Sequence, residues 1–165
     1  MKPILLAFLL FSTSVFAAEG DIHLRLNGRG AHHHVPPAVQ KSLNNAVYGF
    51  SVGYELPYNF IISAGVFKNS LKDYGSNDGR TSNFWQIENR VYDDKTWSAY
   101  VRVRQANNYY QTSYPHSWKA TIGIDVCRKI MSTDWDGCLT HVPWSEGSST
   151  ITASALIVRT TFGTK

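Results

Sequence analysis

Alternation of apolar and polar side chains, with a period of two residues, is the feature that most constrains the fold of this chain. Residues 47–56 show it most clearly, and residues 97–104 and 118–127 repeat it. Successive side chains of a strand point to opposite faces of a sheet, so the pattern predicts strands and not helices. We expect eight strands, at residues 21–29, 46–56, 59–69, 83–92, 97–106, 117–127, 138–144 and 150–162.

The connections between these strands alternate in length. Tight turns are expected at Leu56–Asn59 and at Asp93–Thr96, whereas longer segments follow the first, third and fifth strands. Short turns at one end and long loops at the other are typical of outer-membrane barrels. The sequence therefore predicts an all-β protein, an eight-stranded antiparallel up-and-down β-barrel that crosses the outer membrane.

Alternation alone does not say which face of the sheet points outward. A lipocalin-like cup would place the apolar faces inside, whereas a membrane barrel would place them against lipid. Trp97 and Trp118 lie at strand ends, where aromatic girdles form, and the polar faces carry both signs of charge, as in Glu88, Arg102 and Asp125. Opposite charges would neutralise one another in a narrow lumen, which favours the membrane barrel over the secreted cup.

The first residues have the pattern of a secretory signal peptide. A positive charge at Lys2 precedes the apolar run Ile4–Phe11, and small residues follow. We expect cleavage after Ala17 or Ala18, which divides the chain into a signal peptide at 1–17 and one barrel domain at 18–165. The predicted location is the outer membrane of a Gram-negative cell, with a periplasmic or secreted protein as the alternative. A net charge of +4 is too small to indicate nucleic-acid binding.

Cys127 and Cys138 are the two cysteines of the chain. Their spacing fits neither a Cys-x-x-Cys redox motif nor a zinc site, and exported proteins meet an oxidising compartment. We therefore predict a disulfide between them, at the turn that joins the sixth and seventh strands.

Three consecutive histidines, His32, His33 and His34, lie in the predicted first long loop. A solvated polar loop, one catalytic histidine among the three, and zinc capture are the possible interpretations. An extended chain cannot direct all three side chains at one metal ion, so we assign no metal and no cofactor. Asn69 and Ser70 end the third predicted strand and form the second candidate constellation.

Three short segments carry a resemblance to a known family. Gly65–Ser70, which reads Gly-Val-Phe-Lys-Asn-Ser, resembles the Phe-Lys-Asp-Ser motif of the lipid A palmitoyltransferases and the Tyr-Lys-Asn-Ser of their bacterial and phage relatives. Asn44 with Gly49–Gly53 resembles the start of the second strand in that family. Leu139–Pro143 resembles the Thr-Tyr-Ile-Pro segment that precedes its last strand.

The resemblance implies an eight-stranded outer-membrane enzyme whose rim carries a His, an Asp and a Ser that move an acyl chain from phospholipid to lipid A. By position, Ser70 corresponds to the family serine and Asn69 to its aspartate, with one of His32 to His34 as the base. Asn69 departs from the family, because an amide orients an imidazole without compensating imidazolium charge. Phospholipid and lipid A are then the expected partners of a monomer. A catalytically inert envelope barrel, which would mask a receptor, adhere or reinforce, is the alternative function.

Overall fold

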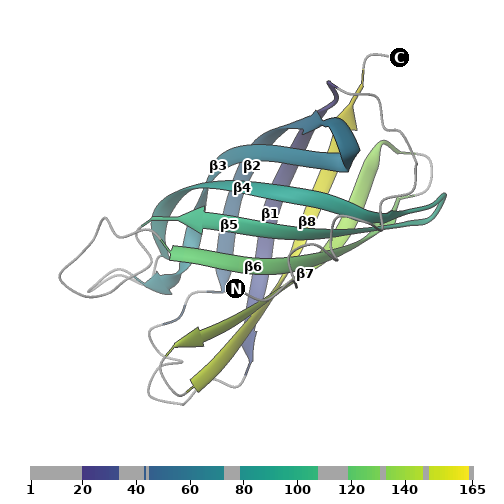
Figure 1. Ribbon diagram of the computed structural model, residues 1–165. Coiled ribbons are helices and arrows are strands. Elements are labelled where there is room, and N and C mark those ends of the chain that lie inside the picture. The colour runs from purple at the N-terminus through teal and green to yellow at the C-terminus, as the bar shows by residue number, and fades with distance from the viewer. Residues whose placement is uncertain are drawn as a thin grey trace, which may run out of the picture.

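The computed structural model describes residues 20–33, 43, 45–72, 79–107, 119–130, 133–146 and 149–163. Eight strands form one closed barrel in chain order, and each pairs antiparallel with the next while the first pairs with the last (Figure 1). A short 3-10 turn, η3 (Pro57–Asn59), joins two of them. The strands are β1 (Ile22–His33), β2 (Ala46–Leu56), β3 (Phe60–Lys72), β4 (Gly79–Asp93), β5 (Trp97–Ala106), β6 (Lys119–Lys129), β7 (Trp135–Glu146) and β8 (Ser149–Phe162).

The eight predicted strands are all present, and the fold class is confirmed. Several predicted boundaries were wrong. β3 continues to Lys72 and not to residue 69, β4 begins at Gly79 and not at residue 83, and β6 covers Lys119–Lys129 and not 117–127. The first strand continues from residue 29 to His33, because its last residues pair with β8 beyond a register shift between Asn27 and Gly30. The seventh strand runs over Trp135–Glu146 and not only 138–144, because its whole length pairs with β8 in spite of Pro143.

Most side chains on the outside of the barrel are apolar, and most of those on the inside are polar. Phe50, Val52, Val103, Ile122 and Ile124 are each about half exposed. The alternate positions of the same strands, including Ser51, Glu55, Arg102 and Asp125, are buried in the lumen. A soluble cup has the opposite polarity, so the lipocalin alternative does not hold, and the outer surface is suited to hydrocarbon.

The two ends of the barrel differ. Strand β1 begins and strand β8 ends at the same end, where Ile22 is paired with Phe162. Short turns join β2 to β3, β4 to β5 and β6 to β7 at this end, and exposed Tyr92 and Trp97 lie beside it. Outer-membrane barrels keep their termini and short turns in the periplasm, so we call this the periplasmic end and the opposite one the outer end.

Strands β6 and β7 pair over only half of their length. Their ladder runs for six residue pairs, from Lys129↔Asp136 to Ile124↔His141, and within the described residues it goes no further toward the outer end. Strand β6 remains paired with β5 as far as Lys119, and β7 remains paired with β8 as far as Glu146. Figure 1 shows β7 and β8 diverging from β6 at this end. The wall of the barrel therefore opens sideways between β6 and β7 in its outer half.

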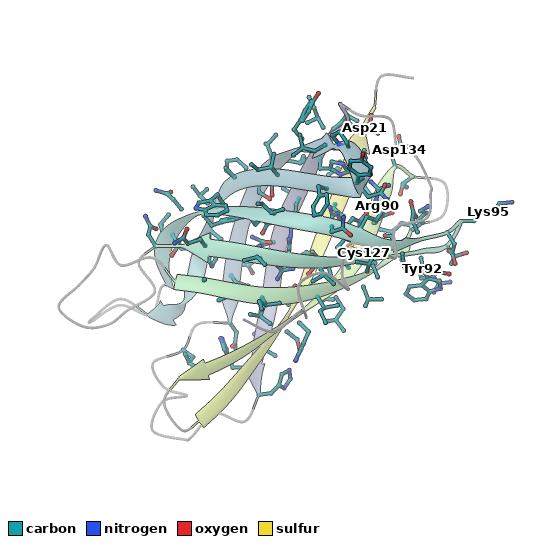
Figure 2. All side chains as sticks on the ribbon, viewed as in Figure 1. Asp21, Arg90, Tyr92, Lys95, Cys127 and Asp134 are labelled. Atoms are coloured by element: carbon teal, nitrogen blue, oxygen red, sulfur yellow. A yellow bond between two sulfur atoms is a disulfide. The ribbon has the colours of Figure 1, made fainter. Side chains whose placement is uncertain are left out.

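The predicted disulfide is present. Cys127 and Cys138 are directly opposite each other in the β6–β7 ladder, with their Cα atoms 3.9 Å apart. Both are buried on the lumen side, where they contact Ile61, Tyr100 and Ile157. The bond thus joins the two strands in the paired half of their length, on the periplasmic side of the opening (Figure 2).

Candidate functional site

Five charged side chains fill the middle of the lumen. Arg25, Arg102 and Arg159 and the carboxylates Glu88 and Asp125 are each at most 3% exposed. They come from strands β1, β4, β5, β6 and β8, whose inward positions meet because an eight-stranded barrel is narrow. Arg159 Nη1 donates to Glu88 Oε2 at 2.9 Å, and Arg102 donates to Asp125. We call these five residues the lumen charge cluster.

Hydrogen bonds from neighbouring polar groups surround this cluster. Arg102 Nη2 donates to Thr140 Oγ1 at 2.6 Å, and the Thr140 hydroxyl donates to Asp125. Gln86 donates to Glu88, and its own oxygen accepts from Arg104 Nε at 2.8 Å. Buried ions are costly unless they are paired and hydrogen-bonded, and these bonds satisfy most of the cluster.

An apolar-walled cavity of about 80 Å³ lies above the cluster, on its outer side. Arg25, Arg102 and Arg104 form its floor, and the guanidinium of Arg104 lies 4.2 Å from the ring centre of Phe84. Thr121 of β6 and Val142 of β7 are both part of its wall, at the place where these strands are unpaired. The remaining wall includes Ala31, Val47, Phe67, Ala155 and Ile157.

His32 is the histidine that reaches this cavity. Its Nδ1 donates to Asn45 Oδ1 at 2.9 Å, and its Nε2 is buried without a hydrogen-bond partner among the described residues. When Nδ1 carries the proton, Nε2 has a free lone pair and can accept one. The imidazole of this cavity-lining residue therefore has one nitrogen held by Asn45 and one nitrogen that can act as a base.

The other predicted site residues are only partly placed. His33 is exposed at the end of β1. The prediction that these histidines lie in a loop was wrong for His32 and His33, since both belong to β1, where they pair with Ala153 and Thr152. Asn69 and Ser70 lie on β3, whose outer end is also the outer end of β1, but their side chains fall outside the described residues. His34 and the signal segment 1–17 also fall outside them.

A second polar group lies at the periplasmic end. His23 Nε2 and Glu55 Oε2 are 2.6 Å apart, and Arg90 Nη2 donates to the same carboxylate oxygen at 2.7 Å. The Thr161 hydroxyl lies 3.1 Å from His23 Nδ1. Glu55 Oε2 thus has two nitrogen partners, and the Arg90 guanidinium compensates its charge, whereas Glu55 Oε1 and Arg90 Nε have no hydrogen-bond partner among the described residues.

Sequence reasoning missed Asn45 and Arg25. Asn45 belongs to the segment between β1 and β2 and has no distinguishing motif; only its contact with His32 gives it a role. Arg25 was visible as an inward position of the first strand, because it alternates with Leu24 and Leu26. Its partners Glu88 and Asp125 lie far away in sequence, and no local signal could have linked them.

The half-exposed apolar side chains form an apolar belt around the outside of the barrel, as lipid requires, and most of the charged side chains in the lumen are paired. The half-exposed aromatics at the periplasmic end, Tyr92 and Trp97, are suited to the membrane–water interface. This chain is an outer-membrane-type β-barrel.

Several solved outer-membrane barrels are similar to this barrel in their strand arrangement. The N-terminal barrel domain of Pseudomonas aeruginosa OprF is 13% identical, with a TM-score of 0.49 over 87% of this chain and 100% of that one. Yersinia pestis Ail in a phospholipid nanodisc is 10% identical, with a TM-score of 0.43 over 87% and 100%. Neisserial surface protein A is 14% identical, with a TM-score of 0.39 over 87% and 96%.

No protein-family model and no curated protein matches the chain. The assignment to the outer-membrane type accordingly rests on the polarity of this barrel itself. Among the described residues, no helix is long and apolar enough to cross a membrane. No group of three or more His, Cys, Asp or Glu in the same residues is placed to hold a metal ion.

Proposed function

We propose that this barrel is an outer-membrane acyltransferase that moves an acyl chain between membrane lipids, with phospholipid as donor and lipid A as acceptor. The observation that carries the proposal is the state of His32, a residue of the cavity lining whose Nδ1 is held by Asn45 and whose Nε2 has no hydrogen-bond partner among the described residues. The sequence resemblance to the lipid A palmitoyltransferases adds Ser70 and Asn69 at the same end of the barrel.

The sideways opening between β6 and β7 supports a lipid as the substrate. It lies in the outer half of the wall, and the cavity behind it is walled by Thr121 and Val142 from the two unpaired edges. An acyl chain in the surrounding membrane would pass from hydrocarbon to apolar wall without crossing water, so its transfer would carry little hydrophobic cost.

Acyl transfer requires a base that removes a proton from the acceptor hydroxyl and then returns it to the leaving oxygen of the donor. His32 Nε2 takes the proton from the acceptor hydroxyl as its oxygen attacks the ester carbonyl of the donor. The new ester bond forms, the bond to the glycerol oxygen of the donor breaks, and the imidazolium returns the proton to that oxygen. Asn45 is a positioning residue, because its oxygen holds the proton on Nδ1. We assign Ser70 to the relay of this proton at the rim, with Asn69 beside it.

Mass spectrometry of lipid A and phospholipids, from cells that express the barrel, tests the proposal. The wild type should add one acyl mass to the acceptor and leave a lysophospholipid. His32→Ala and Ser70→Ala should abolish the product, whereas His33→Ala, which alters an exposed neighbour, is the matched control and should retain it. No product from wild-type barrel that is correctly assembled would contradict acyl transfer and favour the inert envelope barrel.

A further inference from the structure

The floor of the lumen cavity carries more positive than negative charge. Among the described residues, the lumen charge cluster contains three arginines and two carboxylates, and all five are at most 3% exposed. An uncompensated charge in a dry interior is costly, so a group of opposite charge is favoured there.

Arg25 is the arginine of the lumen charge cluster whose hydrogen bonding is incomplete among the described residues. Its Nη2 lies 3.2 Å from Asp125 Oδ2 and its Nη1 lies 3.7 Å from Glu88 Oε1, so both contacts are ion pairs by distance. Its Nε and Nη1 atoms are nevertheless buried without a hydrogen-bond acceptor among the described residues. A buried donor without a partner indicates a place for an additional acceptor, such as a water or an anion.

The position of Arg25 in the cavity indicates which kind of hydrogen-bond acceptor would bind beside it. Arg25 is part of the cavity floor, and the wall between it and the outer end is mainly apolar, from Val47, Phe67 and Ala155. A carboxylate oxygen accepts a charge-assisted hydrogen bond from a free guanidinium N–H, and an apolar wall favours a hydrocarbon chain. A single negative charge on such a group equals the excess of one positive charge in the lumen charge cluster.

We propose that the cavity binds the head of a single-chain carboxylate amphiphile, such as a fatty acid, with its carboxylate on Arg25, the first part of its chain along the apolar wall and the rest of the chain leaving through the opening between β6 and β7. The opening between β6 and β7 gives the chain access from the membrane. In this orientation the polar end of the fatty acid lies on the floor of the cavity. An acyl donor would lie the other way round, with its ester near His32. A bound fatty acid would occupy the same volume as the acyl chain and would therefore compete with the donor.

The proposal does not depend on catalysis, because it uses Arg25 and the cavity and not His32. The test places the purified barrel in phosphatidylcholine nanodiscs and adds dodecanoate, isotopically labelled at its carboxyl carbon, followed by nuclear magnetic resonance. Saturable binding of one dodecanoate per barrel is expected, with none in empty nanodiscs. Dodecanol, which has the same chain without the charge, should bind roughly tenfold more weakly or worse.

Two pairs of variants locate the site. Ala155→Leu fills the cavity and should abolish binding, whereas Ala99→Leu makes the same change on strand β5 away from the cavity lining and should leave binding unchanged. Arg25→Gln should weaken binding roughly tenfold or more. His32→Ala alters the cavity wall but not the charged partner, so it should keep the preference for dodecanoate over dodecanol even where it abolishes acyl transfer, and the two proposals fail separately.

Three outcomes would overturn the proposal. Equal binding of dodecanoate and dodecanol would show an apolar cavity without charge recognition. Full binding to Ala155→Leu would place the amphiphile elsewhere on the barrel. No saturable binding at all would mean that water satisfies Arg25. If Arg25→Gln does not assemble, as judged by its gel mobility before and after boiling, the binding of dodecanoate to Ala155→Leu and the binding of dodecanol to the wild type still test the proposal.

Discussion

Cys127 is bonded to Cys138 three residue pairs before the β6–β7 ladder ends at Ile124↔His141. The covalent bond therefore fixes the paired half of these strands and leaves the outer half free to separate. The covalent constraint therefore lies in the paired, periplasmic half of β6 and β7, and the opening to the lumen lies in their outer half.

Removing this disulfide should destabilise the barrel. The bond closes a short segment, with a sequence separation of 11, and restricts the unfolded chain. We expect the Cys127→Ser/Cys138→Ser variant to lose about 3 kcal/mol of unfolding free energy, measured by urea titration in vesicles. Equal urea midpoints for the variant and the oxidised wild type would show that strand pairing alone holds β6 to β7.

Membrane assembly is tested by fractionation and by gel mobility. The apolar belt predicts that the protein sediments with outer membranes. The closed ladder of eight strands predicts that an unboiled sample migrates differently from a boiled one, because stable barrels resist detergent without heating. Recovery as a soluble periplasmic monomer would contradict this prediction.

Gly49 should tolerate no side chain. A Cβ atom there would lie 2.2 Å from the Val66 carbonyl oxygen and 2.4 Å from Phe67 Cβ, so β2 and β3 would have to separate. We expect Gly49→Ala to cost roughly 3 kcal/mol of unfolding free energy. Gly137→Ala is the matched control, because a Cβ there would meet nothing closer than Ile130 at 3.8 Å. Similar urea midpoints for the two variants would refute the prediction.

The turn between β4 and β5 should weaken in acid. Asp94 accepts hydrogen bonds from the Tyr92 hydroxyl and from the backbone N–H groups of Trp97 and Thr96, and these bonds lower its pKa to about 2. A lowered pKa in the folded state means that the stabilisation is complete above the ordinary pKa of 3.8 and is lost as the pH falls through about 2. Figure 2 shows the neighbouring Tyr92 and Lys95 at the tip of this hairpin.

The measurement is the urea midpoint of the wild type and of Asp94→Asn across this pH range. The wild type should be the more stable protein at pH 7, and the difference should shrink between pH 3.8 and 2 as the carboxylate is protonated. A difference that stays constant with pH would show that the carboxylate charge does not contribute.

The sequence by itself determined the number of strands, their order and which face of each is apolar. Alternation is a local property, and residues such as Phe50 and Val52 show it without any partner. It also predicted the Cys127–Cys138 pair, because two cysteines in an exported chain leave one pairing. It placed the end of the first strand too early, since the last residues of β1 are held by β8, which lies at the other end of the chain.

Only the tertiary structure decided how the barrel is arranged inside. Closure of β1 on β8 brings Arg25 to Glu88 and Asp125, and the segment before β2 brings Asn45 to His32. The opening between β6 and β7 is likewise a tertiary feature, because it begins where the ladder between these two strands ends. These contacts join residues that are distant in sequence, and their formation depends on strand register and barrel width. Local alternation fixes neither quantity, which is why the cavity and its charged floor emerged only in the folded barrel.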